Sequence, residues 1–293
     1  MLAADHCQAA ILQTTPPLAC YLSFTLFDVT QAPAALRALA PLADGRALVL
    51  GVGQTLAVAL GRPVAGLRDF PQIAAPGVDA PATPGALWCW LRGDDRGDLL
   101  LRAQQVAKVL APAFALQACA DGFRHGGAVN RDLSSYEDGT ENPEGDKAVA
   151  AAIDARGASF VAVQQWRHDF ARLAAQQAAG RMDDVIGRHH ADNSEYKDAP
   201  ASSHVKRTDQ DSFKTDAHIL RRNMAWGEGL RGGTMFVGFG HSLDAFEMQW
   251  RRMMGVEDGV TDGLFTFTRP VTGAYFWCPP VKDGRVDLGA LGI

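Results

Sequence analysis

The segment SHVKRTDQDSFKTDAHILRRN, residues 203–223, begins with a Ser-His-Val sequence and ends with two adjacent arginines and an asparagine. His204 could ligate a metal ion, and one of the two arginines could stabilise developing negative charge. About one supersecondary unit separates the histidine from the arginines, so they could face each other across a flat cofactor. A single histidine near an arginine pair is more often a satisfied surface or core residue, so the rest of the chain must decide.

Two long polar insertions contain or adjoin the residues of interest in the chain, and the second of them overlaps this segment. The first covers residues 126–145, and the second covers residues 182–217 and is rich in His, Asp, Ser and Lys. Loops of this length are uncommon unless they carry function. The simplest interpretation of the first insertion, with its Asp138-Gly139 and Asn142-Pro143 dipeptides, is nevertheless a solvated acidic turn.

Hydrophobic periodicity predicts a similar order of elements in the two halves of the chain. In the first half we expect helices at Ala34–Leu42 and Leu99–Leu110, a loop at residues 71–84, and strands at Cys20–Phe27, Ala47–Val52, Ala57–Leu60, Ala86–Leu91 and Phe114–Ala118. In the second half we expect helices at Trp166–Ala179 and Leu243–Met254, and strands at Ser159–Gln165, His218–Arg222, Thr234–Phe239, Leu264–Thr268 and Ala274–Trp277. Apart from one surplus strand in each, both halves have the order β-α-β-β-α-β.

This order is that of the ferredoxin-like split βαβ unit. We therefore predict an α+β fold in which two ferredoxin-like βαββαβ halves, residues 1–125 and 126–293, form a dimeric α+β barrel-like structure. The second half would carry the functional site, because both insertions lie in it. The GVG sequence at residues 51–53 lacks the third glycine and the following helix of a dinucleotide-binding fingerprint.

Composition excludes several classes of function. The chain has 293 residues, 47% of them hydrophobic and 21% charged, with a net charge of −5 and a pI of about 5.9. A nucleic-acid groove or an anionic-membrane surface requires a basic patch, so we expect neither partner. Five widely spaced cysteines without a CxxC pattern argue against a disulfide framework, a zinc knuckle or covalently attached haem. With no signal-peptide or membrane-spanning pattern in the sequence, we expect a cytoplasmic protein.

Five short motifs follow one another in the second half: Asp138-Gly139-Thr140-Glu141-Asn142-Pro143, Ile186-Gly187-Arg188, Ser203-His204-Val205, Ile219-Leu220-Arg221-Arg222-Asn223-Met224 and Thr272-Gly273-Ala274-Tyr275-Phe276. Each motif is weak alone, but five in this order are highly specific. The chain resembles the dye-decolorising peroxidase family, and within it the short class B (P-type) members. It departs from the family's G-x-x-D-G motif at Ser135, which replaces the first glycine, and at Tyr136, which replaces the usual phenylalanine.

The resemblance implies a non-covalently held haem b, with His204 as the proximal ligand of the iron. Asp262 matches the position of the carboxylate on the other ring nitrogen of that histidine, where it would make the imidazole more electron-donating and favour the oxidised ferryl state. Judged from the residues alone, Asp262 is equally well an ordinary turn residue.

On the opposite face of the haem, the resemblance places the residues that act on hydrogen peroxide. Asp138 would move a proton as base and then as acid, and Arg221 would stabilise the departing oxygen. Asn223 would orient peroxide or Asp138. The sequence does not exclude the adjacent Arg222, although the family spacing R-x-N selects Arg221.

Other candidates follow from position only. Two arginines could hold the haem propionates, and three phenylalanines on predicted strands could line the pocket, although the same residues are typical of ordinary surfaces and cores: Arg188, Arg207, Phe236, Phe239 and Phe276. Bulky reductants of the family donate electrons at the surface through Trp or Tyr, for which Tyr136 and Trp226 are candidates.

These observations favour a haem peroxidase that reduces hydrogen peroxide and oxidises dyes, phenolic compounds or metal ions. A haem-binding or haem-handling protein with incidental peroxidase activity and a haem-free ligand-binding protein are the alternatives. The resemblance also implies a homo-oligomer. Some family members are packaged in encapsulin shells through a C-terminal peptide, to which the Gly/Leu segment Leu288–Ile293 is faintly similar.

Overall fold

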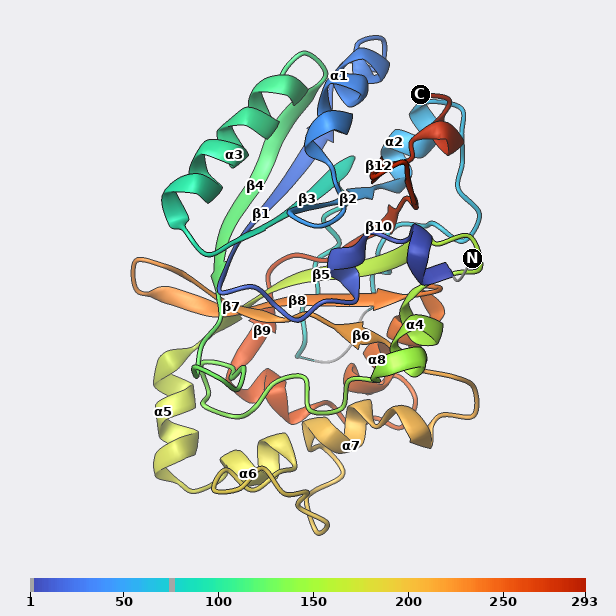
Figure 1. The fold of residues 1–293 in the computed structure, drawn as a ribbon. Helices are drawn as coiled ribbons and strands as arrows, with labels where there is room; N and C mark the ends of the chain where they lie inside the picture. The colour runs from blue at the N-terminus through green and yellow to red at the C-terminus, as the bar shows by residue number, and fades with distance from the viewer. Residues whose placement is uncertain (1–2, 74–76) are drawn as a thin grey trace.

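The computed structural model describes residues 3–73 and 77–293, so residues 74–76 of the loop expected at residues 71–84 lie outside it (Figure 1). Its strands are β1 (Leu18–Leu26), β2 (Leu48–Val52), β3 (Leu87–Gly93), β4 (Phe114–Phe123), β5 (Ser159–His168), β6 (Leu220–Arg221), β7 (Met224–Glu228), β8 (Arg231–Gly240), β9 (Thr268–Pro270), β10 (Ala274–Cys278), β11 (Val281–Lys282) and β12 (Arg285–Val286). Its α-helices are α1 (Ala32–Leu39), α2 (Gln54–Ala59), α3 (Arg96–Leu110), α4 (Gly145–Ala152), α5 (Phe170–Ala178), α6 (Met182–Ile186), α7 (His204–Thr208) and α8 (Asp244–Met253).

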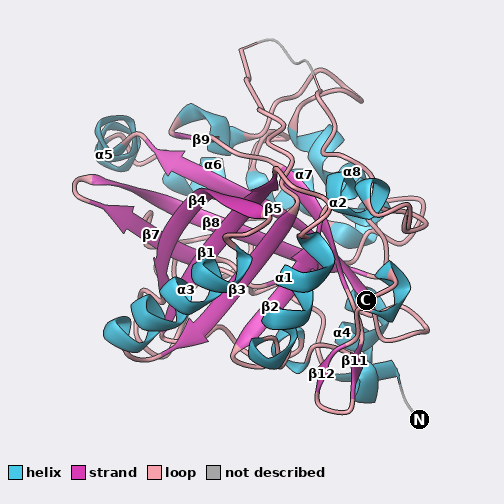
Figure 2. Cartoon of the chain, turned by 90° about the horizontal axis from the view of Figure 1, so that it is seen from above, coloured by secondary structure: helices cyan, strands magenta, loops and turns pink. Residues whose placement is uncertain are grey.

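The strands close an antiparallel barrel. Its order is β8-β7-β4-β1-β3-β2-β10-β5, and β5 pairs back onto β8 over Phe160–Arg167. The short strands β6 and β9 pair with β8 and β5 respectively. Figure 2 shows the strands crossing the molecule with helices around them. The two repeats β1-α1-β2-β3-α3-β4 and β5-α5-β7-β8-α8-β10 confirm the predicted α+β barrel of βαββαβ units. The proposed boundary at residue 125 follows β4, and both halves contribute to one sheet.

Strand alternation divides the apolar residues into two cores. Tyr21, Trp88 and Trp90 point into the barrel together with Phe239 and Phe276, and all five side chains are buried. The alternate residues of the same strands face outwards and are covered by α1, α3 and α8. The barrel is therefore filled with side chains, and space for a ligand must lie outside it.

Several predicted elements are wrong in detail. Ala57–Leu60 is not a strand, because α2 follows Gly53 and ends at Ala59. The expected helix at Trp166–Ala179 begins only at Phe170, since β5 continues to His168 in its pairing with β8 and β9. Leu264–Thr268 is mostly a 3₁₀ helix, Gly263–Thr266. In each case tertiary packing overrides an ambiguous short apolar pattern.

No helix within residues 3–73 and 77–293 combines the length and apolar character needed to span a bilayer.

Gly53 illustrates how tightly the sheet packs. A Cβ atom at this position would lie 1.9 Å from the carbonyl oxygen of Gly85, whereas the backbone N–H of Gly53 donates to Ala86 at 2.9 Å. The GVG sequence therefore permits close packing of the backbone. The prediction that no helix follows it was wrong, because α2 begins at Gln54, but the third glycine of a dinucleotide-binding fingerprint is absent.

We expect Gly53→Ala to lower the free energy of unfolding by about 3 kcal/mol, the upper end of the usual range for overpacking, because backbone must move to admit the methyl group. Denaturant titration followed by tryptophan fluorescence measures this change. Gly227→Ala is the matched control, since its nearest atom would lie 3.5 Å away, and it should change stability by about 0.5 kcal/mol or less. Equal effects of the two substitutions would contradict the packing argument.

Candidate active site

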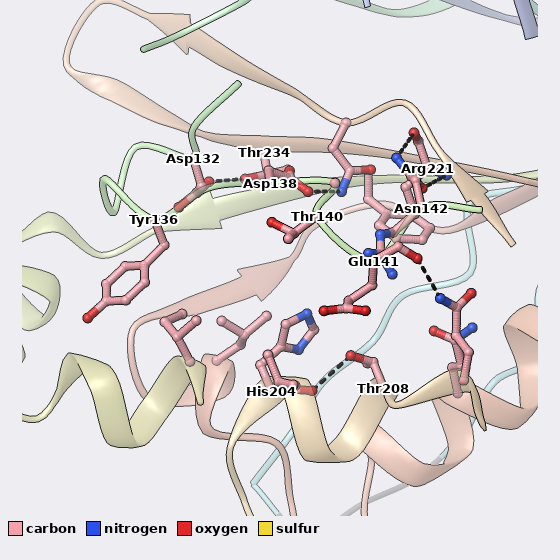
Figure 3. A pocket seen from close by; sticks show the side chains of 18 of the residues that line it. Asp132, Tyr136, Asp138, Thr140, Glu141, Asn142, His204, Thr208, Arg221 and Thr234 are labelled. Carbon is pink, nitrogen blue, oxygen red and sulfur yellow. Dashed lines mark hydrogen bonds between the residues drawn. The ribbon is translucent and has the colours of Figure 1, made fainter. Parts of the chain in front are cut away.

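A cavity of about 700 Å³ lies outside the barrel. One side is formed by outward-facing residues of β5 and β8, such as Trp166 and Phe236, and the other side by α7, α8 and the first insertion. Figure 3 shows His204 on one side of this cavity and Asp138 and Arg221 on the opposite side. The two insertions singled out in the sequence therefore meet here.

His204 is held in one orientation by a buried carboxylate. It is the first residue of α7, and its Nδ1 atom lies 2.8 Å from Oδ2 of Asp262, whose side chain is 0% exposed. The other oxygen of Asp262 accepts a hydrogen bond from the N–H of Leu264 at 2.8 Å. Since Nδ1 is occupied, Nε2 is the ring atom available to a ligand in the cavity.

The opposite wall is a network between the first insertion and the Arg221–Asn223 segment that follows the second insertion. The side-chain amide of Asn223 donates to Oδ1 of Asp138 at 3.1 Å, and its oxygen accepts from the N–H of Val237 at 3.0 Å. Asn142 fixes the backbone of Arg221, accepting from its N–H at 2.8 Å and donating to its carbonyl at 3.0 Å. This clamp by Asn142 was not predicted, although the residue is part of the motif that begins at Asp138.

Arg222 has a different environment from its neighbour. Its guanidinium donates to the backbone carbonyls of Ile11 and Leu12, both at 3.0 Å. Since successive residues of an extended chain point to opposite sides, only one of the two arginines can face the cavity, and Arg221 lines it.

Desolvation shifts the pKa values of the two ionisable groups in this wall, Asp138 and Arg221. It raises the pKa of Asp138 above the usual range of a carboxyl group, and the positive charge of Arg221 opposes the increase only in part. Burial likewise lowers the pKa of Arg221, opposed by Asp138 and Glu141. A carboxyl group whose pKa is moved towards neutrality can both accept and return a proton.

Comparisons with known proteins agree with this geometry. Residues 129–283 match the family model described as Dyp-type peroxidase, C-terminal. The chain is 34% identical over 259 residues to a dye-decolorizing peroxidase of Mycolicibacterium paratuberculosis, covering 77% of this chain and 72% of that protein. It is 32% identical over 286 residues to one of Rhodococcus erythropolis, covering 85% and 83%. The chain belongs to the dye-decolorising peroxidase family.

Solved structures of the family have the same fold. A dye-decolorizing protein from V. cholerae superposes with a TM-score of 0.83 at 27% identity, covering 95% of this chain and 97% of that one. A variant of DypB from Rhodococcus jostii, solved in complex with haem, gives a TM-score of 0.79 at 28% identity, covering 92% and 95%. The predicted family and its class B assignment are confirmed, and with them a haem-dependent peroxidase at the level of the family.

A contact between a buried histidine and a partly buried carboxylate, which the sequence analysis missed, lies beside the wall that carries Asp138. Nε2 of His168 lies 3.1 Å from Oδ1 of Asp132, and Nδ1 of His168 contacts the hydroxyl of Thr268 at 2.8 Å. Thr234 also donates to Asp132. Burial alone would raise the pKa of Asp132, but these contacts lower it well below its usual range. The negative charge of Asp132 in turn contributes to the raised pKa of Asp138. Nothing local in the sequence links Asp132 to His168, which is 36 residues away.

The two departures from the family motif have structural explanations. Ser135 has a φ of 79°, the left-handed conformation for which glycine is the usual residue. Tyr136 is buried, lines the cavity and donates its hydroxyl hydrogen to Asp183. Ser135 therefore adopts a backbone conformation that a glycine could adopt at the same position.

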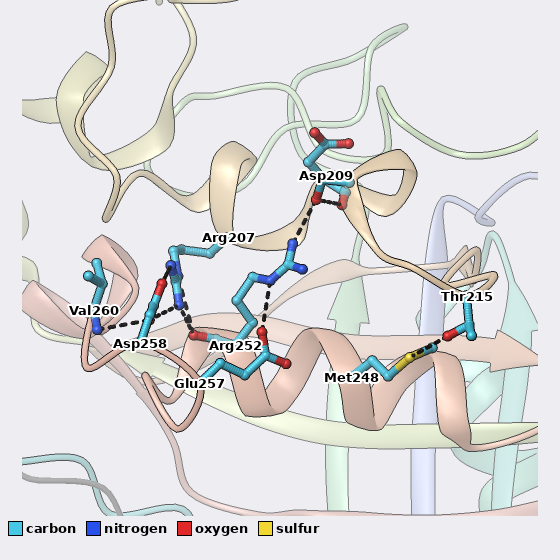
Figure 4. A network of polar contacts seen from close by, with 9 residues as sticks. Arg207, Asp209, Thr215, Met248, Arg252, Glu257, Asp258 and Val260 are labelled. Atoms are coloured by element: carbon cyan, nitrogen blue, oxygen red, sulfur yellow. Dashed lines mark hydrogen bonds and ion pairs between the residues drawn. The ribbon is translucent and has the colours of Figure 1, made fainter.

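Of the predicted propionate ligands, the structure places one at the cavity. Arg188 lines it and donates to Glu141 and to the carbonyl of Asn193. Arg207 is instead buried and donates to both carboxylate oxygens of Asp258, at 2.7 and 2.8 Å (Figure 4). Its guanidinium therefore ties α7 to the loop after α8.

The three predicted phenylalanines do not all face the cavity, because side chains alternate between the two faces of a strand. Phe236 lines the cavity, but Phe239 lies an odd number of residues further along β8 and points into the barrel, as does Phe276 of β10. The aromatic walls come instead from Phe236, Phe267, Phe246, Trp166 and Trp250. Trp226 is also buried and donates to the carbonyl of Trp166 at 2.8 Å.

Substituting Asp138 and substituting Asp132 should change the free energy of unfolding in opposite directions. Because the folded-state pKa of Asp138 is raised, its ionised form costs free energy above that pKa, and Asp138→Asn should raise the free energy of unfolding at pH 7. The gain should shrink as the pH falls through that raised pKa towards the ordinary value of 3.8.

Asp132→Asn is the matched comparison. Because the pKa of Asp132 is lowered, its ionised form stabilises the fold, and the substitution should lower the free energy of unfolding at pH 7. This loss should stay constant down to about pH 4, since it disappears only below the unfolded-state pKa, about 3.9 for aspartate. Denaturant titrations of both variants from pH 7 to pH 4 test the pair, and two losses with the same pH dependence would contradict the assigned charges.

Proposed function

We propose that this protein is a haem peroxidase that reduces hydrogen peroxide to water and oxidises dyes, phenolic compounds or metal ions. One observation carries the proposal: an oriented histidine and an Asp–Asn–Arg group lie on opposite walls of the same cavity. A protein that only binds or transports haem does not require a proton-transfer group with a raised pKa beside a partly buried arginine.

The residues present fit a b-type haem. His204 offers Nε2 while a carboxylate accepts from its Nδ1, the arrangement that makes a histidine a strong iron ligand. The cavity volume of about 700 Å³ lies within the usual range for ligand pockets, roughly 300–1,000 Å³. Aromatic residues from β5, β8 and α8 supply apolar walls, and Arg188 supplies a cation for a propionate. When bound, the haem would supply the two electrons that reduce the peroxide, and the reducing substrate would return them.

Asp138 moves the proton in this reaction. Its Oδ1 atom is held by Asn223, so Oδ2 is the atom that accepts a proton from one peroxide oxygen and returns it to the oxygen that leaves as water. The raised pKa brings the carboxyl group nearer to the pH at which both steps are efficient.

Arg221 stabilises the negative charge that develops on the leaving oxygen. A guanidinium fixed at its backbone by Asn142 needs little reorganisation as the reaction proceeds. Asn223 is a positioning residue, because it acts by holding Asp138.

Packaging in an encapsulin shell is a further part of the prediction. One structural relative is described as the encapsulated DyP-type peroxidase from Mycobacterium smegmatis. In this chain Leu288 and Leu291 are 5% and 3% exposed and pack in the outer core. The segment Leu288–Ile293 can therefore act as a cargo signal only after it is released from its own fold. The homo-oligomer stays a prediction.

We expect Arg221→Ala to slow peroxide reduction by about 100- to 1,000-fold, the usual effect of removing one donor that stabilises transition-state charge. Stopped-flow absorbance of the haem after mixing with peroxide measures this rate. Arg222→Ala is the matched control: it removes contacts to Ile11 and Leu12 and should lower stability, but leave the rate near that of the wild type. Equal rates for Arg221→Ala and the wild type would refute the assignment.

The proximal assignment is tested by His204→Ala. We expect this variant to lose the spectroscopic signature of histidine ligation, as followed by the Soret band and by resonance Raman of the iron–histidine stretch. Retention of unchanged axial ligation would contradict the role of His204. Absence of a Soret band from the wild-type protein expressed with sufficient haem would exclude the haem functions altogether.

A further inference from the structure

A cluster of metal-ligating side chains lies on the outer surface of β1 and β4. Among the described residues, Cys20, Cys119 and Asp121 form a group whose ligand atoms all lie within 4.8 Å of one another. Cys20 is 4% exposed, whereas Cys119 and Asp121 are exposed. None of the three lines the cavity described above.

The register of the strands explains why the three side chains share one face. Asp121 lies directly opposite Cys20 in the β1–β4 ladder, and Cys119 lies opposite Leu22. Cys119 and Asp121 are two residues apart on β4, so both project to the same side of the sheet as Cys20. The cluster is therefore fixed by regular strand geometry.

We propose that these three residues form a zinc site, with two thiolates and one carboxylate as ligands. The Sγ atoms of Cys20 and Cys119 lie 3.7 Å apart. Two thiolates bound tetrahedrally at the usual Zn–S distance of about 2.3 Å have their sulfur atoms about 3.8 Å apart. The spacing therefore matches the edge of a zinc tetrahedron with little rearrangement.

A disulfide fits the same pair less well. It requires the sulfur atoms to approach to about 2.05 Å, and Cα atoms more than about 7 Å apart cannot be bridged without backbone movement. Cys20 and Cys119 are diagonal neighbours, a relation for which residues typically lie about 7–8 Å apart. Regular pairing of the strands therefore favours chelation over a covalent bond.

The ligand set of the cluster also suits a divalent cation. Arg96 of α3 donates to Oδ2 of Asp121 at 3.0 Å, which orients the carboxylate and leaves Oδ1 for the metal. The carboxylate favours Zn²⁺ over Cu⁺, which prefers sulfur ligands alone. Three protein ligands leave the fourth tetrahedral position to water. The ion would tie β4 to β1 where the pairing of β4 with β7, at Gly122 and Phe123, has ended.

Equilibrium dialysis of the reduced holoenzyme against ZnCl₂, with zinc measured per chain by mass spectrometry, tests this site. We expect one zinc ion per chain in the wild type. We expect Cys119→Ser to bind at least about 100-fold more weakly, since loss of even an outer-shell partner costs about 10- to 100-fold. Cys119 is exposed, so its substitution should leave the fold intact. Binding should also weaken as the pH falls, because the thiols must lose their protons.

Asp121→Asn and Cys7→Ala complete the design. Asp121→Asn should weaken zinc binding while leaving both thiols in place, whereas Cys7→Ala removes a buried cysteine outside the cluster and should leave it unchanged. Equal zinc uptake by the wild type and Cys119→Ser would overturn the proposal. So would a wild type that takes up no zinc and instead loses two hydrogens per chain on mild oxidation, since that result assigns the pair to a disulfide. Both readouts are independent of peroxidase activity.

Discussion

The antiparallel ladder between β5 and β8 is the constraint on which the rest of the structure depends. It joins the first strand of the second repeat to the strand that precedes α8, and it closes the barrel. Because side chains alternate, the same two strands send Val161, Val237 and Phe239 into the core and Trp166 and Phe236 to the cavity wall. A slip of one residue would exchange these two sets. Register thus specifies the core and the site together.

The site combines a carboxylate that is stabilised in its charged form with one that is not. Asp132 has His168 and two hydrogen-bond donors, Thr234 and the N–H of Ser134, whereas Asp138 has one amide donor and lies beside an arginine that is itself desolvated. The first arrangement anchors the loop, and the second leaves a group that can exchange a proton. A separation of this kind between neighbouring acids is typical of enzymes that carry out acid–base chemistry near neutral pH.

The proposed zinc site and the proposed haem site use different parts of the same barrel. The haem site depends on long insertions that bring distant residues together, whereas Cys20, Cys119 and Asp121 need only two adjacent strands in regular register. The first is therefore sensitive to loop conformation, and the second to strand pairing alone. The two sites can be tested separately for this reason.

The sequence by itself determined the family, the order of elements in the two repeats and the candidate residues for the proposed chemistry, because motifs such as Ser203-His204-Val205 keep their residue types and spacing whatever surrounds them. Only the tertiary structure decided which of Arg221 and Arg222 faces the cavity, that Phe239 and Phe276 fill the barrel, and that Arg207 is paired with Asp258. It also revealed the Asp132–His168 pair and the clamp of Asn142 on Arg221. These features depend on strand register and on contacts between residues far apart in the chain, and neither leaves a local pattern in the sequence.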